Sequence, residues 1–234
     1  MLAKDIMTTG VICVAPDATV EAIAKLLLEN HISGVPVTNS EGHVLGVVSD
    51  TDLMHRVAGW PSPHESLWLQ WFQSSAAIAA KVKKAVGSCA RDIMTAPAIT
   101  IDPNRPIAQI AEILADRHLR RVPVVADGKI VGIVSRTNLI QALGVTGAHV
   151  DTPSHRDQEI REQVLAHVRE RQPNGKHLVN VLVADGVVHL WGVVDTDEER
   201  EATRLIAESI AGVRSVKSHV STLDLVPSDV ASTV

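Results

Sequence analysis

Two pairs of polar residues in this sequence have the type and spacing to bind a small polar molecule. Ser49 and Asp52 lie three residues apart at the start of a predicted helix, and Ser135 and Asn138 repeat that spacing. A hydroxyl beside the free amides of a helix start suits an anion, and a carboxylate can accept charge-assisted hydrogen bonds from two vicinal hydroxyls. A purely structural interpretation is also open, in which Ser49 caps the helix and Asp52 is a favourable first-turn acid.

Arg120 and Arg121 are the only adjacent arginines in the chain. As a functional pair they would bind a phosphate or polyphosphate, because guanidinium groups make charge-assisted hydrogen bonds to phosphate oxygens. The alternative is that both are solvated surface cations.

The other polar residues form no recognisable catalytic or metal-binding motif. The eleven histidines are scattered without metal-ligand spacing, and Cys13 and Cys89 lack a CxxC pattern. His31 and His118 occupy matching places in a repeat, which favours a helix-end cap or a packing contact over a metal site. We therefore predict a protein that is not an enzyme and has no metal or cofactor, with reduced, structural thiols.

The composition is that of a folded protein with more than one small domain. The chain has 234 residues, of which 45% are hydrophobic and 21% charged, and its formal net charge is −5. The acidic balance argues against a nucleic-acid-binding face. Since the sequence shows neither an export signal nor an apolar stretch of membrane-spanning length, we expect a soluble, cytoplasmic protein.

An internal repeat must position the candidate residues. The opening motif AKDIMT at 3–8 recurs as ARDIMT at 90–95, and a Val-Pro-Val run at 35–37 recurs at 122–124. A Gly-hydrophobic-Val-Ser run then ends each copy before the last helix. Because a copy of about 55 residues is too small for a stable core of its own, we expect the two copies to pack against each other.

Each copy predicts the same series of elements. An extended run (11–14 or 98–101) is followed in the first copy by an amphipathic helix over 19–30. Two apolar strands over 34–38 and 44–48 come next, and a final helix begins near Ser49. This alternation indicates an α/β layered fold.

The ordered motifs Asp-Ile-Met-Thr, x-Val-Pro-Val and Gly-hydrophobic-Val-Ser-x-x-Asp-Leu over residues 1–145 resemble the CBS domain pair, or Bateman module. The resemblance implies that the pair binds an adenosine derivative, such as AMP, ATP or S-adenosylmethionine, in clefts between the copies and reports occupancy to an attached protein. It further implies that Ser49 lies near the phosphate and that Asp52 accepts hydrogen bonds from the ribose hydroxyls. Which copy's strand faces which copy's Ser-x-x-Asp motif stays open.

The same resemblance implies further ligand-binding residues, because family sites also use the segment after Met-Thr and the residues just before x-Pro-Val. The matching positions are Thr8, Gly10, Ile12, Ile32, Ser33 and Gly34 in the first copy, and Thr95, Ile99, Leu119, Arg120 and Arg121 in the second. The second copy departs from the pattern, since Ser135 is followed by Asn138 in place of the ribose-binding acid. Asparagine has one acceptor oxygen and no charge, so we expect one strong site and a second that is weaker, altered or empty.

Residues 58–89 connect the two copies and hold four of the five aromatic residues, Trp60, Trp68, Trp71 and Phe72. The spacing of these residues predicts a helix, and 74–86 predicts a second one. Three interpretations stay open: the aromatics cover the open end of the pair's core, form a self-association surface, or contact a membrane or partner.

The pattern changes after a linker at 146–154. A helix over 157–170, a hairpin around Asp185-Gly186, a helix from 195 or 196 to 211 and a strand over 216–223 predict an αββαβ domain. The Val-rich run from Val181 to Val194 resembles the BON domain, over residues 155–226, with a tail at 227–234. The resemblance implies binding to phospholipid surfaces or partner proteins. Nine basic against twelve acidic residues favour a protein partner, and we expect Trp191 to pack beneath the helices rather than anchor in a membrane.

The leading hypothesis combines these parts in one α+β and α/β protein. CBS repeats at 1–57 and 90–145 form a pseudo-symmetric pair that binds an adenosine nucleotide as a regulatory ligand. The BON domain is the interaction or output module toward an unidentified regulated protein, and the CBS resemblance implies a homodimer. The alternative is a constitutive scaffold or membrane-surface adaptor with a vestigial cleft, which Asn138 and the aromatic linker favour.

Overall fold

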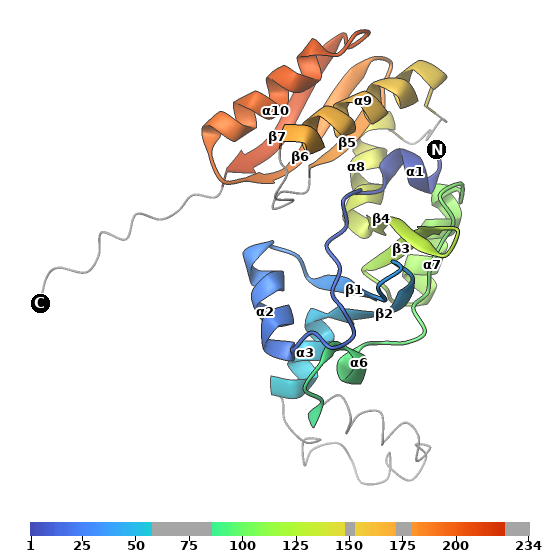
Figure 1. Ribbon diagram of the computed structural model, residues 1–234. Helices are drawn as coiled ribbons and strands as arrows, with labels where there is room; N and C mark the ends of the chain where they lie inside the picture. The colour runs from blue at the N-terminus through green and yellow to red at the C-terminus, as the bar shows by residue number, and fades with distance from the viewer. Residues whose placement is uncertain (58–85, 148–152, 172–178, 223–234) are drawn as a thin grey trace, which may run out of the picture.

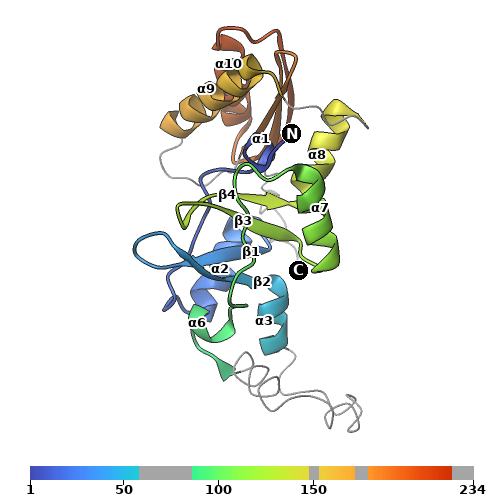
Figure 2. The same ribbon diagram turned by 90° about the vertical axis from the view of Figure 1, so that its right-hand side faces the viewer.

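The computed structural model describes residues 1–57, 86–147, 153–171 and 179–222. Two repeats lie against each other, and the C-terminal domain lies at the end formed by the second repeat (Figures 1 and 2). Residues 58–85, which include the four aromatic residues of the linker and nearly all of its predicted helices, lie outside the described residues.

The two repeats contain the same elements in the same order. The first has α1 (Ala3–Ile6), α2 (Val20–Glu29), β1 (Gly34–Thr38), β2 (Val44–Ser49) and α3 (Asp50–Val57). The second has α6 (Ala90–Ile93), α7 (Ile107–Asp116), β3 (Arg121–Ala126), β4 (Lys129–Ser135) and α8 (Arg136–Thr146). In each repeat the strands form an antiparallel hairpin. The predicted extended runs contribute one parallel bridge each, Val14 to Val37 and Ile101 to Val124.

The opening segment of each repeat packs on the other repeat. The backbone N–H groups of Ala3 and Lys4 donate to carbonyls of residues 105 and 103 in the second repeat. Correspondingly, α6 packs in the core of the first repeat, beside β1 and β2. A Cβ atom at Gly46 or Gly132 would overlap the Met94 or Met7 sulfur of the exchanged segment, which explains the glycine in each second strand. The exchange makes the two repeats one unit.

His31 and His118 end equivalent helices in the left-handed conformation, with φ of 50° and 53°. The His31 N–H donates to the Leu28 carbonyl, and the Ile32 N–H donates to the Leu27 carbonyl. The same pair of bonds follows α7, where His118 and Leu119 donate to Ala115 and Leu114. These are Schellman caps, so the repeated histidines have a structural reason that involves no metal.

The C-terminal domain packs two helices on one face of a three-stranded sheet. Its elements are α9 (His155–Arg171), β5 (Asn180–Ala184), β6 (Val187–Val194), α10 (Asp197–Ser209) and β7 (Ser215–Thr222), in the predicted αββαβ order. The sheet order is β5-β6-β7, and β6 pairs with β7 in parallel. Asp185 and Gly186 form the predicted two-residue turn, both with positive φ.

The opposite face of that sheet lies against the second repeat, next to α1 and α8 (Figures 1 and 2). Val188 and Leu190 point into the domain's own core, whereas Leu182 and Trp191 pack with the core of the second repeat. The expectation that Trp191 packs beneath the helices is therefore wrong. The strand's period of two places Trp191 on the face opposite Val188 and Leu190, and the neighbouring repeat covers that face.

Candidate functional site

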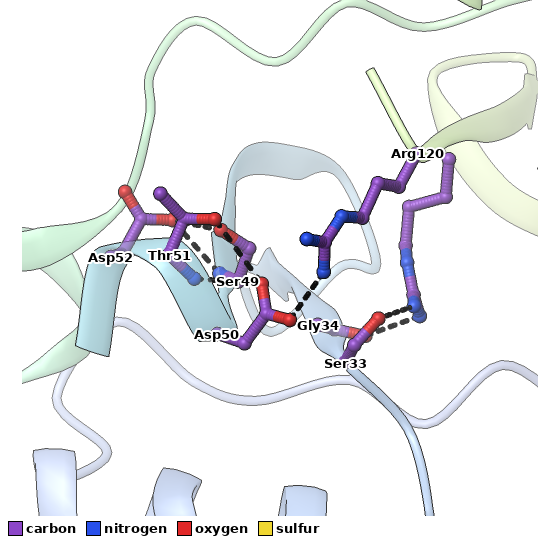
Figure 3. Close-up of polar contacts among 8 residues, drawn as sticks. Ser33, Gly34, Ser49, Asp50, Thr51, Asp52 and Arg120 are labelled. Atoms are coloured by element: carbon purple, nitrogen blue, oxygen red, sulfur yellow. Dashed lines mark hydrogen bonds and ion pairs between the residues drawn. The ribbon is translucent and has the colours of Figure 1, made fainter. Parts of the chain in front are cut away.

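The first cleft is a cavity of about 400 Å³ next to Asp52, at the junction of the two repeats. Asp52 is 6% exposed and lies in the first turn of α3. Its Oδ2 accepts hydrogen bonds from the Ser49 N–H at 2.8 Å and the Ser49 hydroxyl at 2.7 Å. Figure 3 shows this network at the start of the helix. Ser49 and Asp52 thus form hydrogen bonds with each other at the start of α3, and both line the cavity.

The other oxygen of Asp52 is contacted from the second repeat. The Thr95 hydroxyl donates to Asp52 Oδ1 at 3.3 Å, and Thr95 reaches this position through the exchange of the opening segments. A carboxylate has about four acceptor positions. Asp52 therefore places a buried carboxyl group, held from both repeats, at the wall of the cleft.

The adjacent arginines reach across from the second repeat toward the first. Arg120 forms an ion pair with Asp50, as Figure 3 shows. Arg121 donates to the Ser33 hydroxyl and to the Gly34 carbonyl, at 2.9 Å in the second case. Burial lowers the pKa of the Arg121 guanidinium, with Asp50 acting in the opposite direction and Arg120 in the same one. Both arginines therefore take part in the interface between the repeats, Arg121 half-buried and Arg120 exposed at its edge.

The second cleft is a cavity of about 820 Å³ next to Asn138. Asn138 Oδ1 accepts from the N–H and the hydroxyl of Ser135, at 2.7 Å each, as Asp52 does from Ser49. Asn138 Nδ2 then donates to the Thr8 hydroxyl at 3.3 Å. Since a backbone N–H can only donate, the amide oxygen must face Ser135 and the amide NH₂ must face Thr8. The second cleft therefore presents a donor where the first presents an acceptor.

The structure brings most of the candidate residues to these two cavities. The first is lined by Ser33, Ser49, Asp52, Thr95, Ile99, Leu119, Arg120 and Arg121. The second is lined by Thr8, Ile32, Ser33, Arg120, Arg121, Ser135 and Asn138. Gly10, Ile12 and Gly34 line neither cavity. Gly10 is exposed, and Ile12 packs on the core of the first repeat. Gly34 pairs with Ser49 in the hairpin, and its carbonyl accepts from Arg121.

Several lining residues were not identified from the sequence. Asp50 lines the first cleft, and it could have been predicted because it directly follows Ser49 in the sequence. Its counterpart in the second repeat is Arg136, which lines the second cleft. Asn180, Trp191 and Gly192 of the C-terminal domain also line the second cleft, and no local pattern could place them there.

Metal-binding and membrane-spanning features were searched in the described part of the chain. There, no three His, Cys, Asp or Glu side chains are grouped so that they could hold a metal ion. No helix within the same residues combines the length and apolar character needed to cross a bilayer.

Comparison with known proteins gives the family. The CBS domain family model matches residues 3–59 and 90–145, and the BON domain model matches 156–224. Uncharacterized protein MJ1426 of Methanocaldococcus jannaschii is 31% identical over 154 residues, which are 61% of this chain and 91% of that protein. The chloroplastic CBS domain-containing protein CBSX1 of Arabidopsis thaliana is 32% identical over 135 residues, but this chain covers only 57% of its length.

A solved structure supports the same assignment. The crystal structure of CBSX2 in complex with AMP matches 62% of this chain and 98% of that chain, with 29% identity and a TM-score of 0.54. Arabidopsis thaliana has a chloroplastic protein of that name, which is 31% identical to this chain over 140 residues. The chain belongs to the CBS-domain proteins, and it carries a tandem CBS pair followed by a BON domain.

Proposed function

We propose that this chain is a non-enzymatic regulatory protein that binds an adenosine nucleotide in the first cleft. The observation that carries the proposal is the buried carboxylate of Asp52, held by Ser49 and Thr95 at the wall of a cavity between the repeats. The similar structure of CBSX2 was solved with AMP. A nucleotide that contacts both repeats would favour one arrangement of the pair, which is the basis of a sensor.

The chemistry of the cleft fits the parts of a nucleotide. Asp52 would accept hydrogen bonds from the ribose hydroxyls, a charge-assisted interaction. Arg120 and Arg121 line the same cavity and would neutralise the phosphate. Ile99 and Pro97 add apolar surface for the base. AMP, ATP and S-adenosylmethionine share the adenosine part, so all three are candidate ligands.

The BON domain is proposed as the interaction or output module. The sheet face that carries Trp191 packs against the second CBS repeat, so Trp191 is not placed to insert into a bilayer. The excess of acidic over basic residues in the domain further favours a protein partner over anionic lipid. Flotation of the full chain with anionic vesicles is expected to leave the protein unbound, and co-flotation would favour the membrane-adaptor alternative.

A homodimer is also proposed. Large apolar side chains on the outer helices of the pair are exposed, including Met54 on α3 and Ile140 on α8. Exposed apolar side chains of this kind are common on surfaces that associate with another copy. Light scattering coupled to gel filtration should give twice the chain mass of 25.1 kDa, and a strict monomer would contradict the proposal.

Calorimetric titration of the full chain with AMP, ATP and S-adenosylmethionine tests the nucleotide proposal. At least one should bind, and Asp52→Ala should weaken it about 10- to 100-fold, as expected for lost hydrogen bonds to a charged acceptor. Asp116→Ala is the matched control, because Asp116 is exposed and lines neither cleft. Absence of heat for all three ligands, or equal affinity of the Asp52→Ala variant, would refute the function.

A further inference from the structure

The BON domain forms part of the wall of the second cleft. Asn180 on β5 and Trp191 and Gly192 on β6 line this cavity together with residues of both CBS repeats. Asn180 is 5% exposed, and its Nδ2 donates to Gln141 Oε1 on α8 at 2.7 Å. The Asn180 Oδ1 has no hydrogen-bond partner among the described residues. A buried acceptor without a donor is unusual in a folded protein and suits a site that a ligand completes.

The ionisable residues that line the second cleft are all basic among the described residues. Among the described residues that line it, Arg120, Arg121, Arg136 and His31 can carry positive charge, and none is acidic. The whole chain has a net charge of −5, so this concentration of arginines runs against the overall balance. Arg120 is paired with Asp50 of the first cleft, and Arg121 and Arg136 donate to protein oxygens. Three guanidinium groups without an acid among the lining residues still favour an anion, and phosphate most of all.

The BON side of the cavity adds an aromatic surface. Trp191 is stacked on His219 with ring centroids 5.0 Å apart, and His219 is in turn stacked on His189. This stack fixes the indole on the sheet at the edge of the cavity. A rigid aromatic ring offers a planar apolar contact for the ring system of a ligand. The wall therefore combines phosphate-binding groups with a stacking surface.

A buried arginine positions the BON domain on the second cleft. Arg161 on α9 is 7% exposed, and its Nη2 donates to the Met7 carbonyl at 2.7 Å. Its Nε donates to the Val181 carbonyl at 2.8 Å, within the BON domain. Burial lowers its pKa to about 10, with Asp5 opposing that shift, so the side chain stays charged at neutral pH. Met7 precedes Thr8, whose hydroxyl accepts from Asn138. The docking bond and the cleft therefore involve consecutive residues, Met7 and Thr8.

We propose that a phosphate-bearing nucleotide in the second cleft also contacts the BON domain, at Asn180 and Trp191, and that this contact holds the BON domain against the CBS pair. The proposal goes beyond the function proposed for the first cleft, whose lining residues all come from the CBS pair. It gives the BON domain a ligand-dependent position, since any ligand that contacts both walls favours the docked arrangement.

Fluorine NMR of the full chain, labelled with 5-fluorotryptophan, tests contact with the BON wall. The probes are ATP and sodium triphosphate, and Asp52→Ala removes the contribution of the first cleft. The Trp191 signal, assigned by its loss in Trp191→Phe, should shift in a saturable way on addition of ATP. A shift with triphosphate as well would place the phosphates near this wall. A Trp191 signal unchanged by both probes would overturn the proposal.

Titration of a docking variant tests the linkage. Arg161→Met, in the Asp52→Ala background, should weaken ATP binding to the second cleft about 5- to 20-fold, within the usual range of coupling between sites. The matched control is Leu205→Ala, an exposed apolar residue on the opposite side of the BON sheet. With Asp52 intact, AMP binding by Arg161→Met should stay within about twofold of wild type, which also shows that the CBS pair is folded. Unchanged ATP affinity in the Arg161→Met variant would overturn the linkage between the second cleft and the BON domain. Absence of AMP binding by the wild-type chain would instead refute the function proposed for the first cleft.

Discussion

The two clefts of the CBS pair share a backbone and differ in chemistry. Asp50 and Asp52 begin the helix at the first cleft, and Arg136 and Asn138 occupy the same places at the second. In the first, the Thr95 hydroxyl donates to the carboxylate, whereas in the second the amide donates to the Thr8 hydroxyl. Replacing one oxygen with an NH₂ group thus reverses a hydrogen bond. A repeated fold can therefore carry two sites of opposite polarity.

Asp52→Asn should convert the first cleft to the chemistry of the second and give the largest effect. The Ser49 bonds can survive, because asparagine keeps one acceptor oxygen, as Asn138 shows. The acceptor toward ribose becomes a donor, so AMP affinity should fall about 10- to 100-fold. Calorimetry measures the change. Unaltered affinity would mean that the polarity of this residue does not distinguish the clefts.

Asn138→Asp makes the reverse exchange in the second cleft. The Thr8 hydroxyl can rotate to donate to the new carboxylate, and Arg136 lines the same cavity. Adenosine, which has the ribose but no phosphate, should bind this cleft about 5- to 10-fold more tightly. Titration in the Asp52→Ala background isolates the second cleft. No gain would show that the rest of its wall excludes adenosine.

Arg120→Met should affect both clefts, because Arg120 lines each of them. AMP binding should weaken about 5- to 10-fold through loss of a charge-assisted bond to phosphate, while adenosine binding stays the same. The free energy of unfolding should change by less than about 1 kcal/mol, since the ion pair with Asp50 is at the surface. Equal losses for AMP and adenosine would argue against contact with phosphate.

His31→Gly and His118→Gly should have the smallest effect, and an equal one. Both histidines have a left-handed backbone, which glycine adopts without steric cost. Each substitution should raise the free energy of unfolding by about 0.5 kcal/mol in urea denaturation without ligand. Unequal changes would show that the repeats differ in fold as well as in site chemistry.

Much of the architecture could be predicted from local sequence patterns. The period of apolar residues predicted a helix over 19–30, and α2 spans Val20–Glu29. The Asp185-Gly186 pair predicted the BON hairpin, because a tight two-residue turn requires positive φ at both positions. The ligand clefts were predictable only in part. Ser49 and Asp52 are three residues apart, and this spacing is enough to predict their contact. Their partner Thr95 is distant in the sequence, so its contact with Asp52 could not be predicted in the same way.

Trp191 shows where prediction from the sequence stopped. The alternation of side chains along β6 predicts that Trp191 and Leu190 face opposite sides of the sheet. It does not predict which part of the molecule covers either side. The helices α9 and α10 cover one side, and the second repeat covers the other. The place of Trp191 at the second cleft therefore depended on domain docking.

The sequence by itself determined the repeat, the order of the elements, their caps and turns, and the exchange of Asp52 for Asn138. Each of these depends on residues near one another along the chain, where backbone preference and spacing are sufficient. Only the tertiary structure decided that the opening segments change places, that Thr95 reaches Asp52, and that the BON sheet walls the second cleft. Such contacts depend on how completed surfaces fit together, which the local pattern of a strand or helix does not specify.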